Sequence, residues 1–229
     1  MNDFDRCNFC KPNSPSLWKW NVAFLIFFLV LVVMTATKVS NGFDEAVFRF
    51  LGTVKDSALG AGWIIEVARD ITALGSVTVL IAITLIVLGY MLMHKNVYAA
   101  SFLASSAFGA IIVSHTLKKL FERARPGTDL HLTQVFTSSF PSAHAMDAAS
   151  VYTALALVLA GVQHQRHSRR FTLYVAATMI FVIGFSRIYL GVHWPVDVMA
   201  GWSAGIVWTL SCYMLACHWA RKQNLGTVK

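Results

Sequence analysis

Long apolar runs recur along this chain of 229 residues. About 20 consecutive apolar residues allow a helix to cross the hydrocarbon core of a bilayer. The six runs of this kind are about Leu17–Thr37, Ile71–Met93, Val97–Leu117, Ala143–Val162, Phe171–Phe185 and Val198–Cys217. Lipid offers the backbone no hydrogen-bond partners, so only helices or closed barrels span it, and these runs lack the alternation of barrel strands. The sequence therefore predicts an all-α polytopic membrane bundle with six transmembrane helices.

The composition agrees with a chain that lies mostly in lipid. Hydrophobic residues make up 56% of it and charged residues only 13%, far from the balance of a water-soluble domain. The connectors between the runs are too short for a separate soluble domain, so we expect a single membrane-embedded domain over residues 1–229. The first run follows a basic flank, as in a secretory signal, but it is long and no clear small-residue cleavage site follows it. We expect it to remain as an anchor.

The segment between the first two runs has an amphipathic pattern. Its apolar residues fall at helical spacing, at Phe43, Val47, Phe50, Leu51 and Val54. Its charged residues fall on other faces, at Asp44, Glu45, Arg49 and Lys55. This pattern predicts an amphipathic interfacial helix along the membrane surface. We interpret it as an ordinary connector rather than as a lid that guides lipid.

The formal net charge of +8 raises the question of a nucleic-acid partner, but the positions of the charges argue against one. Basic residues gather in short connectors, in the segment 163–170 and at Arg221 and Lys222. Such residues mark the cytoplasmic ends of membrane helices, so six spans would put both termini in the cytoplasm. Further positive charge falls on the opposite side and needs its own explanation. The sequence makes no prediction of oligomeric state.

Cys7 and Cys10 have the spacing of half a zinc site or of a redox pair. A four-ligand zinc site needs two further ligands, and none lies nearby in the sequence. We interpret both residues as surface cysteines of a cytoplasmic tail.

Three groups of polar residues stand at the ends of the apolar runs, where polar side chains of a membrane protein are functional candidates. The first group follows the third run and contains Lys118, Arg125 and Pro126. Lys118 and Arg125 are seven positions apart, about two helical turns, so a continuous helix would present both on one face as an anion clamp. The proline would end the helix soon after. The alternative is a basic collar whose side chains reach to lipid headgroups.

The second group, Phe140-Pro-Ser-Ala-His144, precedes the fourth run. Pro141 and Ser142 are typical of a helix start, where free backbone N–H groups and the positive end of the helix dipole attract phosphate. His144 would stand at the rim of that helix end, in position to give a proton to a departing oxygen. Taken alone, a histidine in this place is more often a simple interfacial residue.

The third group extends from Ser186 and Arg187 to His193 and Asp197, between the fifth and sixth runs. His193 and Asp197 are four positions apart. This separation allows a carboxylate to hold one ring nitrogen and leave the other free to attack. Arg187 adds a third cation to the two of the first group.

The predicted topology brings the three groups to one side of the membrane. No crossing separates the first group from the second, and two crossings separate the second from the third. Under the positive-inside orientation this side is non-cytoplasmic, and the groups account for the positive charge there. His144, His193 and Asp197 are suitable zinc ligands, but the three cations would repel a metal ion, so we expect no metal and no other cofactor.

These residues resemble the motifs of the type 2 phosphatidic acid phosphatase family. The matching pattern is Lys118 with six residues before Arg125-Pro126, then Pro141-Ser-Ala-His144, then Ser186-Arg187 with five residues before His193 and three before Asp197. The motifs cover about 80 residues, and the six-span plan extends the resemblance over nearly the whole chain. The family pattern usually has glycine where this chain has Ala143, and the added methyl group would narrow the approach of the backbone to a phosphate.

The resemblance implies a chemistry for the site. It implies that His193 attacks phosphorus to form a phosphohistidine, that Asp197 orients His193, and that His144 protonates the leaving group. It implies that the phosphoryl oxygens are bound by the remaining motif residues, Lys118, Arg125, Ser142, Ala143 and Arg187. Phosphoryl transfer needs mainly positioning and charge stabilisation, which agrees with the residues themselves.

The leading hypothesis is therefore a metal-independent membrane phosphatase that hydrolyses a lipid mono- or diphosphate at the non-cytoplasmic leaflet. Candidate substrates are phosphatidic acid, phosphatidylglycerophosphate, undecaprenyl diphosphate and a lipid A phosphate. Lipid-to-lipid phosphotransfer is an alternative, because an acceptor other than water can resolve a phosphohistidine. An anion transporter or channel is a second alternative, but it would place charges near the bilayer midplane rather than at one rim. Small size and the resemblance favour a bacterial inner membrane, with the active site facing the periplasm or exterior.

Overall fold

The computed structural model describes residues 17–55, 62–126 and 138–226 of the chain. Every regular element in these ranges is a helix. The helices are α2 (Leu17–Ala36), α3 (Asn41–Lys55), α4 (Gly62–Ala73), α5 (Val77–Met93), α6 (Val97–Phe121), α7 (Ala143–Val162), α8 (Arg166–Tyr189) and α9 (Pro195–Gly226). The all-α prediction is confirmed, and Cys7 and Cys10 lie outside the described residues.

Five of the helices, α2, α6, α7, α8 and α9, are long and apolar enough to cross a membrane by themselves. The helices α4 and α5 together form a sixth candidate span, which is bent by 44° at their junction. The predicted second run, Ile71–Met93, is therefore not one straight helix. It breaks at Gly75 and Ser76, because the Ser76 hydroxyl accepts a hydrogen bond from the Val79 N–H at 3.4 Å and begins a new helix.

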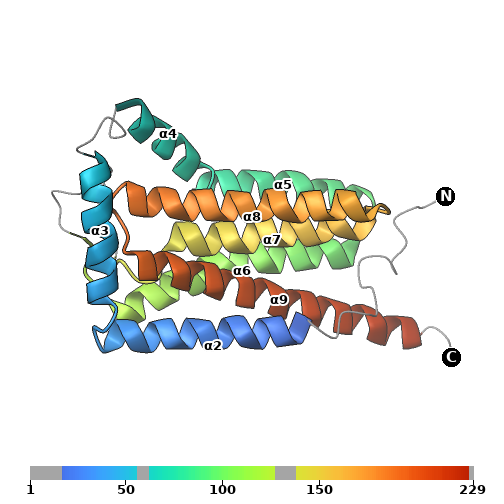
Figure 1. Cartoon of the computed structure of the whole chain (residues 1–229). Coiled ribbons are helices and arrows are strands. Elements are labelled where there is room, and N and C mark those ends of the chain that lie inside the picture. The colour runs from blue at the N-terminus through green and yellow to red at the C-terminus, as the bar shows by residue number, and fades with distance from the viewer. Residues whose placement is uncertain (1–16, 56–61, 127–137, 227–229) are drawn as a thin grey trace.

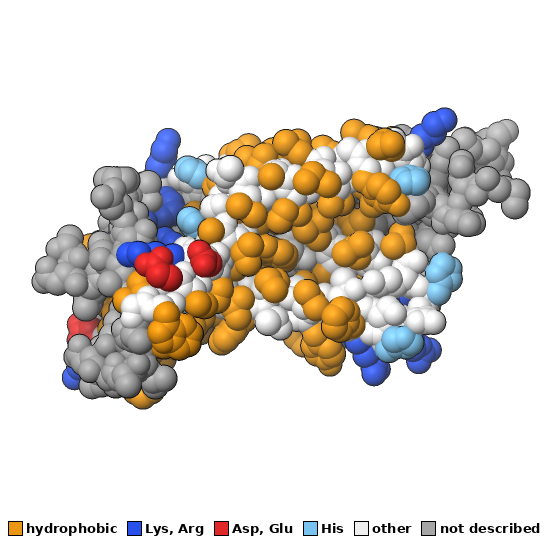
Figure 2. Space-filling view, turned by 90° about the horizontal axis from the view of Figure 1, so that it is seen from above, with side chains coloured by type: hydrophobic (Ala, Val, Ile, Leu, Met, Phe, Trp, Pro, Cys, Tyr) orange, Lys and Arg blue, Asp and Glu red, His pale blue; other side chains and the backbone are white. Residues whose placement is uncertain are grey.

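The long helices α5 to α9 lie side by side, α2 lies along α9, and α3 crosses one end of the bundle (Figure 1). The prediction of a helix between the first two spans is confirmed by α3. The C-terminal end of α9, the α5–α6 connection and the basic start of α8 all lie at the opposite end from α3. Hydrophobic side chains cover the middle of the face seen in Figure 2, while charged side chains gather toward the two ends. This distribution is that of an integral membrane protein.

The helices α7 and α9 pack closely because two glycines of α9 face the backbone of α7. Gly201 and Gly205 are four positions apart, the spacing of small residues that lets membrane helices approach each other. A Cβ atom on Gly201 would lie 2.6 Å from the Ser142 carbonyl oxygen, and a Cβ atom on Gly205 would overlap the Met146 carbonyl oxygen. Any larger residue would push the two helices apart.

Two tryptophans of α9 occupy the space that other glycines leave free. The indole of Trp202 lies against Gly184 of α8, and the indole of Trp208 lies against Gly109 of α6. Each indole N–H donates to a backbone carbonyl of the helix that it contacts, at 3.1 Å. The flat rings thereby fill the bundle without leaving a buried donor unpaired.

Buried hydroxyls add polar contacts between the helices. The Ser150 hydroxyl of α7 donates to the Ser106 carbonyl of α6 at 2.9 Å and lies 2.8 Å from the Thr209 hydroxyl of α9. Hydrogen bonds of this kind stabilise helix association in lipid, where water cannot compete for the polar groups.

We predict that substitution by alanine changes the unfolding temperature in opposite directions at Gly89 and at Gly205. Alanine is the better helix former by about 0.5–1 kcal/mol at both positions. Nothing lies within 4 Å of a Cβ atom on Gly89, so Gly89→Ala should keep or raise the unfolding temperature in detergent. Gly205→Ala should lower it by several degrees, because overpacking costs about 1–3 kcal/mol and outweighs the helix preference. Shifts in the same direction would contradict the close packing of α9 on α7.

Candidate active site

The three groups of polar residues meet at the end of the bundle that α3 crosses. The C-terminal end of α6, the N-terminal end of α7 and the connection from α8 to α9 all lie there (Figure 1). Segments that are far apart in the sequence are thus brought to one place by antiparallel helix packing.

Lys118 and Arg125 lie close together, but they do not share one face of a continuous helix, and this part of the sequence prediction is wrong. The residue after α6, Glu122, has a left-handed conformation with φ 37°, which ends the helix before Arg125. Arg125 therefore comes from the connector. Lys118 Nζ donates to the Ser138 carbonyl oxygen at 2.7 Å, and Arg125 donates to the same oxygen at 3.4 Å. One carbonyl thus holds both cations together.

The N-terminal end of α7 presents free hydrogen-bond donors. Ser142 is the N-cap residue, but its buried hydroxyl makes no capping hydrogen bond and has no partner in the described part of the chain. The N–H groups of the first helical turn, those of Ala143, His144 and Ala145, have no acceptor within the helix. The Ser142 hydroxyl and these N–H groups form the kind of donor set that binds a phosphate oxygen.

His144 and Arg187 belong to the same cluster. The positive charges that act on His144 are those of Arg187, Lys118 and Arg125. Arg187 is buried near the C-terminal end of α8, where its guanidinium donates to the Thr72 hydroxyl of α4 at 3.0 Å. The Nε of Arg187 is also buried and has no hydrogen-bond partner among the described residues. A buried guanidinium with an unused donor favours an anionic ligand at this place.

His193 is 2% exposed and has a different neighbour at each ring nitrogen. Its Nε2 lies 3.2 Å from Nη1 of Arg125, which also donates to the Val192 carbonyl at 2.6 Å. A guanidinium can only donate, so Nε2 is the unprotonated nitrogen and carries a lone pair. Nδ1, which carries the proton, lies 3.4 Å from the Ser139 hydroxyl oxygen. The lone pair of His193 therefore faces a cation.

The sequence predicted that the carboxylate of Asp197 holds the ring of His193 directly, but the structure shows no direct hydrogen bond between them. Oδ2 of Asp197 lies 3.7 Å from Nδ1 of His193, which is longer than a hydrogen bond. The Ser139 hydroxyl lies between them, because it donates to Oδ2 of Asp197 and contacts Nδ1 of His193. The Trp194 backbone N–H also donates to Oδ2, at 3.1 Å. Asp197 thus acts on the ring in two ways, through the Ser139 hydroxyl and through the negative charge of its own carboxylate.

The surroundings of His193 lower its pKa well below the usual value of 6.5. Burial contributes most, because it disfavours the charged imidazolium. The positive charges of Arg187, Arg125 and Lys118 lower the pKa further. His193 is therefore neutral at pH 7 and keeps the lone pair that a nucleophile requires.

Arg123 is a site residue that the sequence analysis missed. Its guanidinium contacts Asp197 Oδ1 at 2.5 Å and Asp44 Oδ2 at 2.8 Å. Ser139 and Thr72 were missed as well. Ser139 stands immediately before the Phe140-Pro141 pair, and Arg123 is, with Lys119, one of two cations between Lys118 and Arg125, so both had a signal in the sequence. Thr72 and Asp44 had none, because only the tertiary structure brings them to this end of the bundle.

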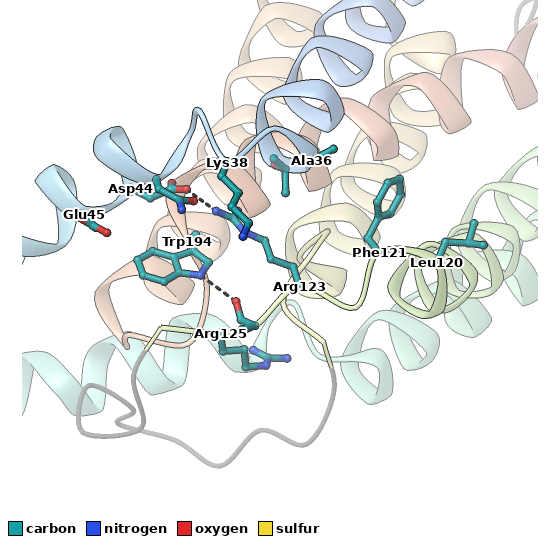
Figure 3. Close-up of a pocket in the computed structure, with 12 residues that line it drawn as sticks. Ala36, Lys38, Asp44, Glu45, Leu120, Phe121, Arg123, Arg125 and Trp194 are labelled. Atoms are coloured by element: carbon teal, nitrogen blue, oxygen red, sulfur yellow. Dashed lines mark hydrogen bonds and ion pairs between the residues drawn. The ribbon is translucent and has the colours of Figure 1, made fainter.

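A cavity of about 520 Å³ lies beside these residues, between α3 and the C-terminal ends of α2 and α6 (Figure 3). Its polar lining includes Lys38, Arg123 and Arg125 together with the carboxylates of Asp44 and Glu45, and its apolar lining includes Leu120 and Phe121. Arg125 also contacts His193, so a group in this cavity would be one side chain away from the histidine. A mixed lining of this kind suits a molecule with a charged head and an apolar body.

The predicted site residues are thus assembled, but their roles stay predictions. Lys118, Arg125, Arg187, His144, His193 and Asp197 form one cluster at the bundle end, and Ser142 with Ala143 begins the helix that faces it. No three His, Cys, Asp or Glu side chains are grouped as metal ligands would be in the ranges 17–55, 62–126 and 138–226.

Comparison with known proteins gives three concordant matches. Residues 98–222 match the model of the PAP2 superfamily. Phosphatidylglycerophosphatase B of Bacillus subtilis is 30% identical over 191 residues, which cover 81% of this chain and 89% of that protein. A putative undecaprenyl-diphosphatase of Escherichia coli is 32% identical over 176 residues, which cover 74% of this chain and 81% of that protein.

A solved structure has the same fold. The crystal structure of a transmembrane PAP2 type phosphatidylglycerolphosphate phosphatase from Bacillus subtilis superposes with a TM-score of 0.76. The match is 27% identical and covers 88% of this chain and 96% of that chain. The resemblance found in the motifs is therefore confirmed, and the anion transporter is not supported. The chain belongs to the PAP2 superfamily of membrane lipid phosphatases.

Proposed function

We propose that this enzyme hydrolyses a lipid mono- or diphosphate through a phosphohistidine on His193, without a metal ion, at the non-cytoplasmic leaflet. The observation that carries the proposal is the placement of the His193 lone pair against Arg125, which shares an acceptor with Lys118. A phosphoryl group that enters between these side chains meets a nucleophile and two positive charges at once. The cations stabilise the charge that develops on the phosphoryl oxygens, which a metal ion does in other phosphatases.

The reaction proceeds in two displacements. The lone pair on Nε2 of His193 forms a bond to phosphorus, and the bond from phosphorus to the lipid oxygen breaks as His144 gives that oxygen a proton. In the second displacement, water gives a proton to His144 and attacks the phosphohistidine. Inorganic phosphate then leaves the site, and His193 returns to its neutral form. Ser142, Arg187 and the N–H groups of the first turn of α7 hold the oxygens in both steps.

The proposed substrates are lipids whose phosphate is at the membrane surface. Phosphatidylglycerophosphate and undecaprenyl diphosphate are the first choices, because the relatives bear the names of phosphatases for these lipids. Phosphatidic acid and a lipid A phosphate are further candidates. The cavity beside Arg125 supports the proposal, since its polar and apolar linings suit a headgroup and the first part of a lipid tail.

The proposed orientation puts both termini in the cytoplasm of a bacterial cell and the site on the outer side of its inner membrane. The first turns of α8 contain Arg166, Arg169 and Arg170, and they lie at the end opposite the site (Figure 1). Positively charged connectors favour the cytoplasmic side.

We expect the purified enzyme to release phosphate from at least one of the four lipids in the presence of EDTA. His193→Ala should lower kcat by several orders of magnitude, because the P–N bond then cannot form. His167→Ala is the matched control, since it removes an exposed histidine at the opposite end of the bundle and should leave kcat unchanged. When turnover of a lipid labelled with ³²P in its phosphate is quenched in alkaline detergent, which preserves the acid-labile P–N bond, the wild type should carry label and His193→Ala should not. Full activity of His193→Ala would refute the nucleophile.

We expect His193 to remain unprotonated, and so able to act as the nucleophile, at pH values at which an ordinary histidine is protonated. The pKa of His193 is lowered by burial and by its cationic neighbours, so the ring stays neutral as the pH falls from 7.5 through 6.5. As the pH is lowered, the value of kcat/KM, corrected for ionisation of the substrate phosphate, should therefore show no fall with a midpoint near pH 6.5. A fall at that pH that the substrate does not explain would show that His193 has an ordinary pKa.

The orientation is tested in intact cells. A fluorescent protein that folds only in the cytoplasm, fused after Lys229, should fluoresce, and alkaline phosphatase at the same position should be inactive. The reverse pattern would place the site in the cytoplasm and overturn the leaflet assignment, while leaving the phosphohistidine chemistry unaffected.

A further inference from the structure

We propose that Asp44 and Arg123 are positioning residues of the active site, and that they make the interfacial helix α3 part of the catalytic machinery. The pair acts on Asp197, which in turn acts on His193. The inference rests on the proposed function, because it takes His193 as the nucleophile. It changes the interpretation of α3, which the sequence presented as an ordinary connector.

Arg123 joins two carboxylates that come from different parts of the chain. Its Nη1 contacts Oδ1 of Asp197 at 2.5 Å, and its Nη2 contacts Oδ2 of Asp44 at 2.8 Å (Figure 3 shows the contact with Asp44). Nη2 also lies 3.3 Å from the Ser40 hydroxyl. The two ends of one planar guanidinium therefore fix the distance between α3 and the start of α9.

Asp44 is tied to the same segment by its second oxygen. Oδ1 of Asp44 accepts a hydrogen bond from the Val196 N–H at 3.1 Å, one residue before Asp197. Asp44 is 1% exposed, although it belongs to an amphipathic surface helix. Burial raises the pKa of Asp44, and the hydrogen bond and charge of Arg123 oppose that effect. An acidic residue buried in this manner is held for its contacts, because a buried carboxylate without a partner is costly.

The contacts of Asp197 show what the bridge controls. Its Oδ2 accepts from the Ser139 hydroxyl and from the Trp194 N–H, and Ser139 then contacts the histidine ring. Its Oδ1 is bound by Arg123. A carboxylate that is held at both oxygens cannot rotate, so the Ser139 hydroxyl and the ring of His193 keep one orientation. Removing Arg123 or Asp44 leaves the nucleophile in place but frees its supports to move.

The apolar contacts of α3 are separate from this bridge. Phe48 packs edge-on against Trp194, with ring centroids 5.1 Å apart. The guanidinium carbon of Arg123 lies 5.7 Å from the centroid of the same indole. The docking of α3 thus has an apolar part, which Phe48 represents, and a charged part, which Asp44 and Arg123 supply. The two parts can be tested independently.

The test compares kcat, KM and unfolding temperature for Asp44→Asn and Arg123→Lys. Asparagine keeps the shape of Asp44 without its charge, and lysine keeps the charge of Arg123 without its two-ended geometry. Each variant should lose roughly 10- to 100-fold in kcat, as small misplacements of catalytic groups do, while KM changes less than about threefold. The double variant should be no worse than the more impaired single variant, because either change breaks the same bridge.

Two controls separate positioning from general stability. Glu66→Gln removes the carboxylate of an exposed ion pair, in which Glu66 lies 2.6 Å from Arg69, and it should leave kcat unchanged. Phe48→Ala should lower the unfolding temperature at least as much as Asp44→Asn, but it should lower kcat much less. A loss of kcat that follows the unfolding temperature across all of these variants would overturn the inference, as would unchanged kcat in Asp44→Asn and Arg123→Lys.

The inference and the proposed function fail in different ways. If His193→Ala is active or carries labelled phosphate, the nucleophile is wrong and the role of the bridge falls with it. If the wild type is active, His193→Ala is inactive and both bridge variants behave as wild type, only the positioning role is wrong.

Discussion

The arrangement of the site depends on one backbone contact between α7 and α9. The Ser142 N–H donates to the Asp197 carbonyl at 3.0 Å, and a turn later Gly201 lets the two helices pack at the level of the Ser142 carbonyl. This contact fixes the phosphate-facing end of α7 against the helix that carries the carboxylate next to His193. The geometry of the site therefore depends on the close packing of the small residues Gly201 and Gly205 of α9 against α7.

The second condition is the balance of buried charge. Lys118 and Arg187 are buried and Arg125 is half-buried, so their positive charge lacks much of the stabilisation of bulk water. Backbone carbonyls and the Thr72 hydroxyl satisfy part of it. The remaining positive potential lowers the pKa of His193 and keeps its ring neutral. In the proposed mechanism the same charges would bind the phosphoryl group and prepare the nucleophile, the task that a metal ion has in other phosphatases.

Arg123 has a different task from the other cations. It is bound to Asp44 and Asp197, so these two carboxylates already neutralise its charge. Its role is to connect elements. Through it, α3 is joined to Asp197 at the start of α9, and under the proposed mechanism the position of α3 would be coupled to the chemistry.

The sequence by itself determined the fold class, the family and six of the clustered residues. Apolar runs must become helices in lipid, and charged residues at their ends can be assigned to one side by counting crossings, so Lys118, Arg125, His144, Arg187, His193 and Asp197 were predictable. Only the tertiary structure decided how they meet. It showed that Arg125 comes from a connector because Glu122 ends α6, that Ser139 stands between His193 and Asp197, and that Asp44 and Thr72 reach the site. Periodicity reports which face of a helix is apolar, but it does not report which distant side chains that face will touch, because such contacts depend on how closely helices pack and where each one ends.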